Sequence, residues 1–166
     1  AMGGGLERAL ACHARIVADD SAIQLSLPEA KPGLMPGFGA TQRLSRLLPL
    51  TDAVTALSTG KSFRPKSALK IGLVTELADS GNVISAAKVW IKNNQGAKQP
   101  WDEKPARVPT GQIHTAKNLP ILAAAAAQTR KNTFGNYPAP AAILRSVYHG
   151  LQMPIDQALK VEARNF

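Results

Sequence analysis

Two glycine-rich turns, each leading into a helix-forming segment, constrain this chain more than any other feature. The first is Gly3-Gly4-Gly5, just before Glu7, and the second is Pro36-Gly37-Phe38-Gly39. Glycine permits backbone conformations that other residues resist, so such turns let another group approach the main chain closely. Backbone N–H groups at the start of a helix also favour negative charge nearby. A second acid, Glu29, lies between the two turns.

The two acids predict a site for acid/base chemistry. Adding water across an activated double bond needs one group to take a proton from water and another to protonate carbon. Two carboxylates with unequal pKa values can divide these tasks. Taken singly, Glu7 has a plainer interpretation as a helix-start residue and Glu29 as a solvated turn residue. The spacing permits the two to meet, because one helix and one returning strand are expected between them.

Hydrophobic periodicity predicts a mostly helical chain with short strands. A helix is expected over 7–17, and alternation predicts a strand over 22–27 with Ser26 facing outward, ended by Pro28. Thr41 is the expected N-cap of the next helix. Helices are expected over 42–48, 52–58, 66–71, 83–93, 114–131, 138–150 and 154–164, and a short strand over 73–77.

A long segment rich in proline and glycine, 95–112, predicts a boundary. It is longer than compact domains usually leave without helices or strands. The expected organisation is therefore one unit over 1–94, a loop boundary over 95–112, and a helical C-terminal segment over 113–166. Nothing precedes the first glycine turn to hold it, so we expect the chain to be part of something larger.

Composition and charge disfavour several other classes of protein. The net charge is +9, but the excess is spread along the chain without a basic block or interleaved aromatic residues. That pattern favours a solvated surface, partly facing a polyanionic small molecule, over nucleic-acid binding. A single cysteine, Cys12, allows no intramolecular disulfide and fits a reducing compartment. The histidines lack ligand spacing, so no metal site is expected. No apolar run approaches the roughly 18 residues of a membrane span.

Two short motifs fail as nucleotide-binding signals. The turn at 37–39 lacks the third glycine of a dinucleotide-binding fingerprint, because position 42 is Gln42. Gly60-Lys61-Ser62 lacks the upstream glycine of a phosphate-binding loop. The sequence therefore predicts no nucleotide cofactor on these residues.

A run of motifs resembles the crotonase (enoyl-CoA hydratase/isomerase) superfamily. The similarity is nearly continuous over residues 1–80 and weakest over 81–132. The spacing of the two acids is similar to that in the α-subunit of the multifunctional fatty-acid β-oxidation enzyme. The motifs are Met2-Gly-Gly-Gly-Leu-Glu7, Leu27-Pro-Glu29, Gly33-Leu-Met-Pro36-Gly-Phe-Gly39-Ala-Thr-Gln-Arg43, Leu57-Ser-Thr-Gly60-Lys61 and Ala68-Leu-Lys-Ile-Gly72-Leu-Val.

The resemblance implies an α/β, predominantly helical fold: the C-terminal half of a crotonase (ClpP-like) domain followed by linker helices. In the multifunctional β-oxidation enzymes, the linker leads to an NAD-dependent 3-hydroxyacyl-CoA dehydrogenase. NAD is therefore expected only on that other domain, and no cofactor on this segment. The implied partners are an acyl-CoA thioester substrate and further copies or subunits of a β-oxidation complex. The implied location is cytoplasmic.

Site residues follow from the same resemblance. Gly4 matches the glycine whose N–H forms half of the oxyanion hole, Glu7 the acid that activates water, and Glu29 the acid that exchanges a proton at C2. The loop over 33–39 matches the one that lines the acyl pocket. Its expected substrate-binding residues are Gly37, Phe38 and Gly39.

The implied reaction is hydration of trans-2-enoyl-CoA to 3-hydroxyacyl-CoA. Two alternatives stay open: isomerisation of the double bond with one acid as a proton shuttle, and a non-catalytic fragment that only folds and associates. Arg8 and Ala40 depart from the family pattern, which usually has an apolar residue and a glycine there. The family's other oxyanion N–H lies upstream of residue 1, so the isolated 166 residues are expected to be inactive.

Overall fold

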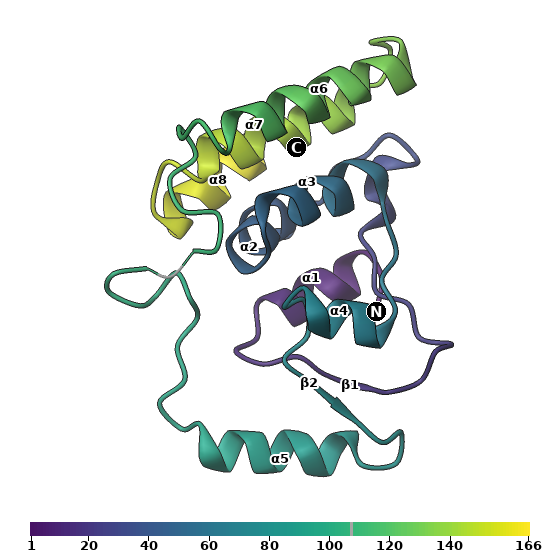
Figure 1. Ribbon diagram of the computed structural model, residues 1–166, viewed down its shortest axis with the longest axis vertical. Helices are drawn as coiled ribbons and strands as arrows, with labels where there is room; N and C mark the ends of the chain where they lie inside the picture. Colours follow the sequence, from purple (N-terminus) through teal and green to yellow (C-terminus); the bar gives the residue numbers. More distant parts are fainter. Residues whose placement is uncertain (107) are drawn as a thin grey trace.

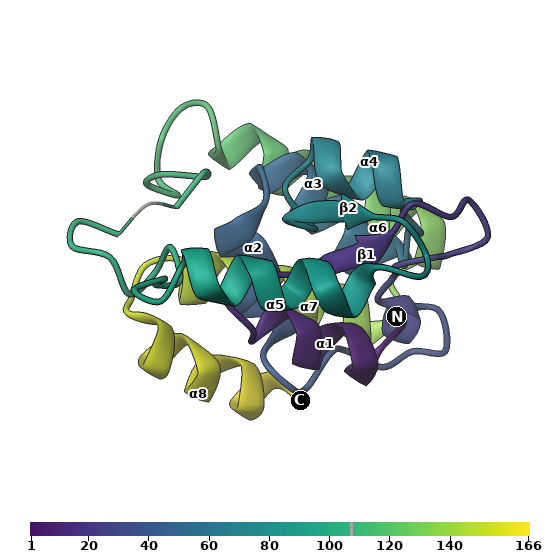
Figure 2. The same cartoon turned by 90° about the horizontal axis from the view of Figure 1, so that it is seen from below.

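Helices stack in layers above a short pair of parallel strands in the computed structural model, which describes residues 1–106 and 108–166 (Figure 1). The strands β1 (Ile16–Ala18) and β2 (Glu76–Ala78) pair in parallel, with Ile16 opposite Glu76. Helix α5 (Val83–Asn93) packs against both strands (Figure 2) and lies apart from the C-terminal helices (Figure 1). Above the strands lie α1 (Gly4–Leu10) and α4 (Pro65–Lys70).

The hydrophobic core lies mainly among α2, α3 and α7. These helices span Ala40–Leu47, Leu50–Thr59 and Pro138–Gly150. The C-terminal helices α6 (Leu119–Thr133) and α8 (Ile155–Asn165) both pack on α7, and α8 also contacts α2. The large apolar side chains with almost no exposed surface include Leu10, Leu27, Leu44, Leu48, Leu57, Leu73, Ile143 and Val147.

Polar groups join α2 to α7 inside this core. The Gln42 side-chain amide donates to the Ser146 carbonyl oxygen at 2.9 Å. The Arg46 guanidinium donates to the carbonyl oxygens of Gly150 at 2.7 Å and Met153 at 2.9 Å, where α7 ends. A cation is favourable at a helix C-terminus, although burial lowers the pKa of Arg46 to about 10. The C-terminal helices are therefore fastened to α2.

Two predictions near the N-terminus are wrong in part. The helix expected over 7–17 begins earlier, at Gly4, and ends at Leu10. Ile16 and Val17 instead form β1, as β-branched side chains favour when a partner strand is available. The strand expected over 22–27 is reduced to isolated bridges at Leu25 and Ser26, and Ser26 is buried rather than outward-facing.

Other elements differ by smaller shifts. Thr41 is not the N-cap of α2: the helix begins at Ala40 and Gly39 caps it in a left-handed conformation, with φ 96°. The strand expected over 73–77 forms over Glu76–Ala78. The helices expected over 83–93 and 138–150 are confirmed at both ends. Helices over Leu50–Thr59, Pro65–Lys70, Leu119–Thr133 and Ile155–Asn165 lie within a few residues of their expected bounds.

The segment expected as a loop over 95–112 has no helix or strand among its described residues. Hydrogen bonds join this segment to the residues just after α1 and to α2. The Gln99 side chain donates to the carbonyl oxygens of Ala11 and Cys12, at 3.2 and 2.7 Å. The Thr110 hydroxyl donates to the Ser45 carbonyl oxygen at 3.2 Å. Whether this segment separates two domains stays a prediction.

Candidate active site

The first glycine turn forms the entrance to α1. Gly3 has φ 54° and ψ −134°, and its N–H donates to the Ser26 carbonyl oxygen at 2.9 Å. Its own carbonyl oxygen accepts the N–H groups of Leu6 and Glu7. The N–H of Gly4, the first helical residue, has no acceptor among residues 1–106 and 108–166. This turn therefore presents one backbone donor at the positive end of a helix.

Glu7 is buried and used by the backbone of the second glycine turn. Its side chain is only 4% exposed. Oxygen Oε1 accepts hydrogen bonds from the N–H groups of Phe38, at 2.9 Å, and Ala40, at 3.0 Å. Burial of a carboxylate is costly unless such donors accompany it. Glu7 does lie in the first turn of α1, as its plainer interpretation expects, but its carboxylate is buried and hydrogen-bonded to another element.

Glu29 lies in a single turn of 3₁₀ helix, η1 (Pro28–Ala30), and is half-buried. Its Oε2 is buried with no hydrogen-bond partner in the described part of the chain. Burial raises the pKa of Glu29 above its ordinary value; a hydrogen bond from its own backbone lowers the pKa, and the negative charge of Glu7 raises it further. Glu29 is thus favoured in the protonated form more than an exposed glutamate is.

The structure brings the two predicted acids together at the start of α1. Glu7 lies in the first turn of this helix, and Glu29 lies against its N-cap, Gly3, where a Cβ atom would be 3.0 Å from Glu29 Oε1. Each acid comes from a different element, α1 and η1. Position 3 requires glycine for two reasons: its positive φ and the closeness of the Glu29 carboxyl group.

The second glycine turn faces inward with its backbone and outward with its aromatic side chain. The Phe38 ring is 61% exposed, while the N–H groups of Phe38 and Gly39 donate to buried carboxylates. A Cβ atom at Gly37 would come within 2.7 Å of the Phe166 ring. The amides of Phe38 and Gly39 are therefore occupied, whereas the Phe38 ring is exposed and able to contact a ligand.

One residue of this site, Glu162 on α8, is missed by the sequence reasoning. It is 2% exposed, and it accepts N–H groups from Gly39 at 2.6 Å and Thr41 at 2.9 Å, as well as the Thr41 hydroxyl. Burial raises the pKa of Glu162, hydrogen bonds from Thr41 and Gly39 oppose this rise, and the charge of Glu7 adds to it. The one signal in the sequence is that this acid falls one helical turn after Ala158, on the buried face of α8.

The two departures from the family pattern leave this geometry intact. Arg8 is exposed and lies next to the buried Glu7 on α1, where adjacent side chains diverge. Ala40 is fully buried, and its contribution to the site is its backbone N–H, which any residue except proline supplies. Neither side chain displaces Glu7.

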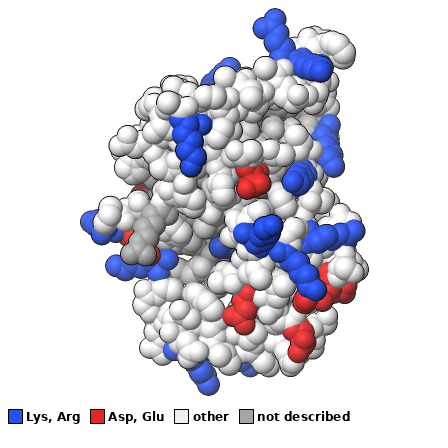
Figure 3. All heavy atoms as spheres, in the orientation of Figure 1, with Lys and Arg blue, Asp and Glu red and all other residues white. Residues whose placement is uncertain are grey.

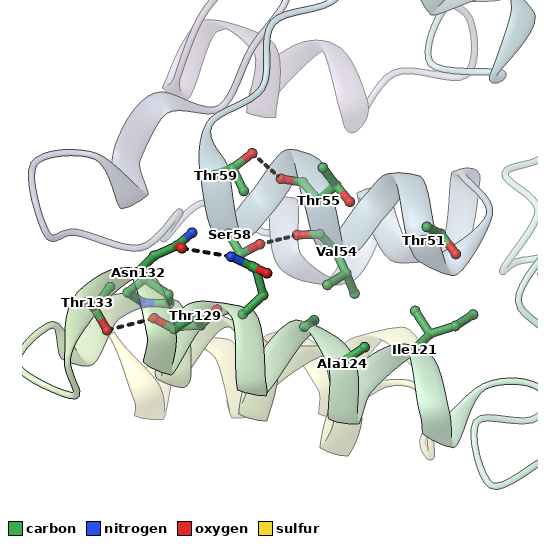
Figure 4. A pocket seen from close by; sticks show the side chains of 13 residues that line it. Thr51, Val54, Thr55, Ser58, Thr59, Ile121, Ala124, Thr129, Asn132 and Thr133 are labelled. Atoms are coloured by element: carbon green, nitrogen blue, oxygen red, sulfur yellow. Dashed lines mark hydrogen bonds between the residues drawn. The ribbon is translucent and has the colours of Figure 1, made fainter.

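Two cavities of similar size lie away from this site. One of about 460 Å³ runs between α3 and α6, and one of about 490 Å³ between α6 and α7. Figure 4 shows the first, in which the Ser58 and Thr59 hydroxyls donate to carbonyl oxygens of their own helix. Glu7 and Glu29 line neither cavity. Among the described residues, no cluster of three potential metal ligands and no helix able to cross a bilayer was found.

Comparison with known proteins shows the family of this chain. The family model for enoyl-CoA hydratase/isomerase matches residues 1–102. The fatty acid oxidation complex subunit alpha of Shewanella frigidimarina is 39% identical over 165 residues, which are 99% of this chain and 23% of the relative. The corresponding Shewanella baltica subunit gives the same values. The chain thus spans about a quarter of the length of these relatives.

Solved structures of the same family share the fold. The enoyl-CoA hydratase of Geobacillus kaustophilus is 26% identical with a TM-score of 0.53, covering 99% of this chain and 47% of that one. The enoyl-CoA hydratase of Mycobacterium smegmatis is also 26% identical with a TM-score of 0.53, covering 90% of this chain and 60% of that one. The expected mostly helical α/β fold, equal to about half of a crotonase-fold structure, is confirmed. The chain belongs to the enoyl-CoA hydratase/isomerase family.

Proposed function

We propose that these residues carry the two acids and one oxyanion donor for the hydration of a trans-2-enoyl-CoA thioester to a 3-hydroxyacyl-CoA. One observation carries the proposal: Glu7 lies in the first turn of α1, Glu29 lies against Gly3, the N-cap of that helix, and the N–H of Gly4 has no acceptor among the described residues. Their environments differ, since Glu7 accepts two amide hydrogen bonds and Glu29 has an orphan buried oxygen. Such a difference suits a division into base and acid.

The proposed chemistry balances with these groups alone. The Glu7 carboxylate takes a proton from water while the water oxygen forms a bond to C3 of the enoyl group. The electron pair of the double bond moves to C2 and the thioester oxygen, where the Gly4 N–H stabilises the negative charge. Protonated Glu29 then delivers its proton to C2. Proton exchange with solvent restores both acids for the next turnover.

The surrounding assembly is also a proposal. Shewanella relatives that are fatty acid oxidation complex subunits support a role in an assembly that handles acyl-CoA thioesters. We expect the 166 residues on their own to turn over slowly, because the first glycine turn presents a single N–H, and an oxyanion site short of one donor is slower by about 100- to 1,000-fold. No nicotinamide cofactor is expected on this segment.

The test uses a chimera in which these 166 residues replace the aligned stretch of the Shewanella frigidimarina subunit. Hydration of crotonyl-CoA is followed by loss of the enoyl-thioester absorbance, with circular dichroism as the check on folding. Glu7→Gln and Glu29→Gln are each expected to lower turnover by about 100- to 10,000-fold. The exposed β2 residue Glu76 supplies the matched control, since Glu76→Gln should change the rate little.

Two results would contradict the proposed hydration by the two acids, and a third would contradict the slow turnover expected of the isolated chain. Turnover that survives both Gln substitutions would remove the acids from the reaction. Conversion of a 3-enoyl-CoA to the 2-enoyl isomer without hydration would favour the isomerase alternative, which uses one acid as a proton shuttle. Brisk hydration by the isolated 166 residues would show that one oxyanion N–H from this chain is enough.

A further inference from the structure

Two carboxylates divide the four N–H groups at residues 38–41 in an alternating pattern. The first and third of these groups donate to Glu7 Oε1. The second and fourth donate to the two oxygens of Glu162, which also accepts the Thr41 hydroxyl. Glu162 comes from α8, near the opposite end of the chain from Glu7. The start of α2 is thus held between the first and the last helix.

α2 depends on these outside acids because it provides no cap of its own. Its N-cap, Gly39, has no side chain, and its first turn contains no acidic residue. The first N–H groups of any helix lack partners within the helix. Here they are also buried, so each needs an acceptor from elsewhere in the fold. Negative charge is favourable at this helix end, which helps to hold two carboxylates close together.

The division of donors leaves Glu7 bound through a single oxygen. Within the described residues, its Oε2 accepts no hydrogen bond from a neighbouring group. We propose that Glu162 is a positioning residue for Glu7: it occupies the N–H groups of Gly39 and Thr41, so that Glu7 keeps Oε2 for the attacking water. This inference rests on the proposed function, because it assigns Glu162 a task in the same reaction.

Removal of Glu162 takes the acceptor from three buried donors, the N–H groups of Gly39 and Thr41 and the Thr41 hydroxyl. The nearest carboxylate able to satisfy them is Glu7, which already binds the adjacent N–H groups. If Glu7 turns Oε2 toward Gly39 and Thr41, its free oxygen is lost to the water. A displacement of about 1 Å in such a group can cost about 100-fold in rate. Glu162 therefore acts on the reaction only through Glu7.

The first experiment needs no turnover and uses the 166-residue chain. NMR follows the side-chain carboxyl carbon of Glu7 and hydrogen exchange of the 38–41 amides in Glu162→Ala and Glu162→Gln. The Ala variant should shift the Glu7 carbon signal, and the Gln variant, which keeps one acceptor oxygen, should shift it less. Asn165→Ala is the control, because it removes a contact of α8 with Ser146, 2.9 Å long, without touching these amides. It should leave the Glu7 signal in place.

The second experiment measures turnover in the chimera. Glu162→Ala should lower kcat by about 100-fold while KM changes little, since no contact with substrate is removed. Asn165→Ala should leave both nearly unchanged. An unmoved Glu7 signal in both Glu162 variants overturns the inference, as does an equal loss of kcat in Asn165→Ala. Because the NMR result is independent of hydration, a failed positioning role is distinguishable from a failed proposed function. If Glu162→Ala does not fold, Glu162→Gln alone decides both measurements.

Discussion

At the scale of single residues, the Glu29 carboxyl is buried without full hydrogen bonding among the described residues. Its buried Oε2 has no partner in the described residues, and burial raises its pKa. A carboxyl group in this environment keeps its proton to a higher pH and can donate it. Its ionisation lowers the free energy of unfolding. The change in the pH dependence of folding when Glu29 is replaced therefore reports on this residue.

Glu29→Gln tests that cost. Below the ordinary glutamate pKa, folded and unfolded chains are both protonated and Glu29 adds no penalty. As pH rises through the raised folded-state pKa, the unfolded chain has already lost its proton and the folded chain is increasingly destabilised. The gain in stability from Glu29→Gln should therefore be larger at neutral pH than at pH 4, as measured by urea unfolding. The same gain at both pH values, or one also given by Glu76→Gln, would contradict the raised pKa.

A second single position, Gly150, is constrained by packing alone. A Cβ atom there would overlap the side-chain amide of Gln42, which is fully buried and hydrogen-bonded to Ser146 and Thr41. Gly150→Ala should destabilise the fold by about 1–3 kcal/mol, the usual cost of overpacking. Gly81→Ala is the control, since nothing lies within 4 Å of a Cβ atom placed at Gly81. Equal unfolding midpoints for the two variants would show that Gln42 can move aside.

At the scale of elements, local motifs in the sequence predict Glu7 and Glu29 as site residues, and their catalytic roles stay a prediction. Their hydrogen-bond partners could not be predicted from the sequence. Glu162 was missed because its hydrogen bonds join residues more than a hundred positions apart, which no periodicity records. The same contact explains why Thr41 failed as the N-cap: its hydroxyl points to α8 instead of to its own helix.

The first helix was overextended for a related reason. Spacing of apolar residues continues past Leu10, but Ile16 and Val17 find a parallel partner in β2, which lies far along the chain. Pairing of this kind decides the conformation of a β-branched segment more than its local pattern does. The helices with clear ends, over 83–93 and 138–150, were predicted correctly because their signals are local.

The packing of α8 against the second glycine turn leads to a coupled prediction. Gly37→Ala places a methyl group against the Phe166 ring and should cost about 1 kcal/mol. In a Phe166→Ala background the ring is gone, and the same substitution should cost little. A double-mutant cycle by urea unfolding measures this coupling, expected between about 0.5 and 3 kcal/mol. Additive effects would show that the turn and the end of α8 do not touch in solution.

At the scale of the whole molecule, apolar side chains are buried to different extents in different helices. No residue of α5 is buried, although the helix is amphipathic; Ile84 is 72% exposed and Val89 57% exposed. The core lies instead around α3 and α7, where Leu57 has no exposed surface. On the face shown in Figure 3, basic side chains are scattered without forming a continuous stripe.

This difference in burial predicts a small loss of stability for a substitution in α5 and a large loss for one in α3. Ile84→Glu should change the free energy of unfolding by less than about 0.5 kcal/mol, as exposed substitutions do, and should weaken binding of an apolar dye. Leu57→Ala should cost about 2–5 kcal/mol. Thermal and urea unfolding measure both. A large loss from Ile84→Glu would mean that α5 is covered by other parts of the molecule in solution.

The central claim is that Glu7 activates water and Glu29 moves the proton at C2, and one isotope measurement separates these roles. Butyryl-CoA has protons at C2 but no double bond, so their exchange with D₂O requires the C2 acid and the oxyanion donor but no addition of water. In the chimera, Glu29→Gln should abolish this exchange, whereas Glu7→Gln should keep most of it while losing crotonyl-CoA hydration. Equal loss of exchange in both variants, or exchange that survives Glu29→Gln, would contradict the division of roles.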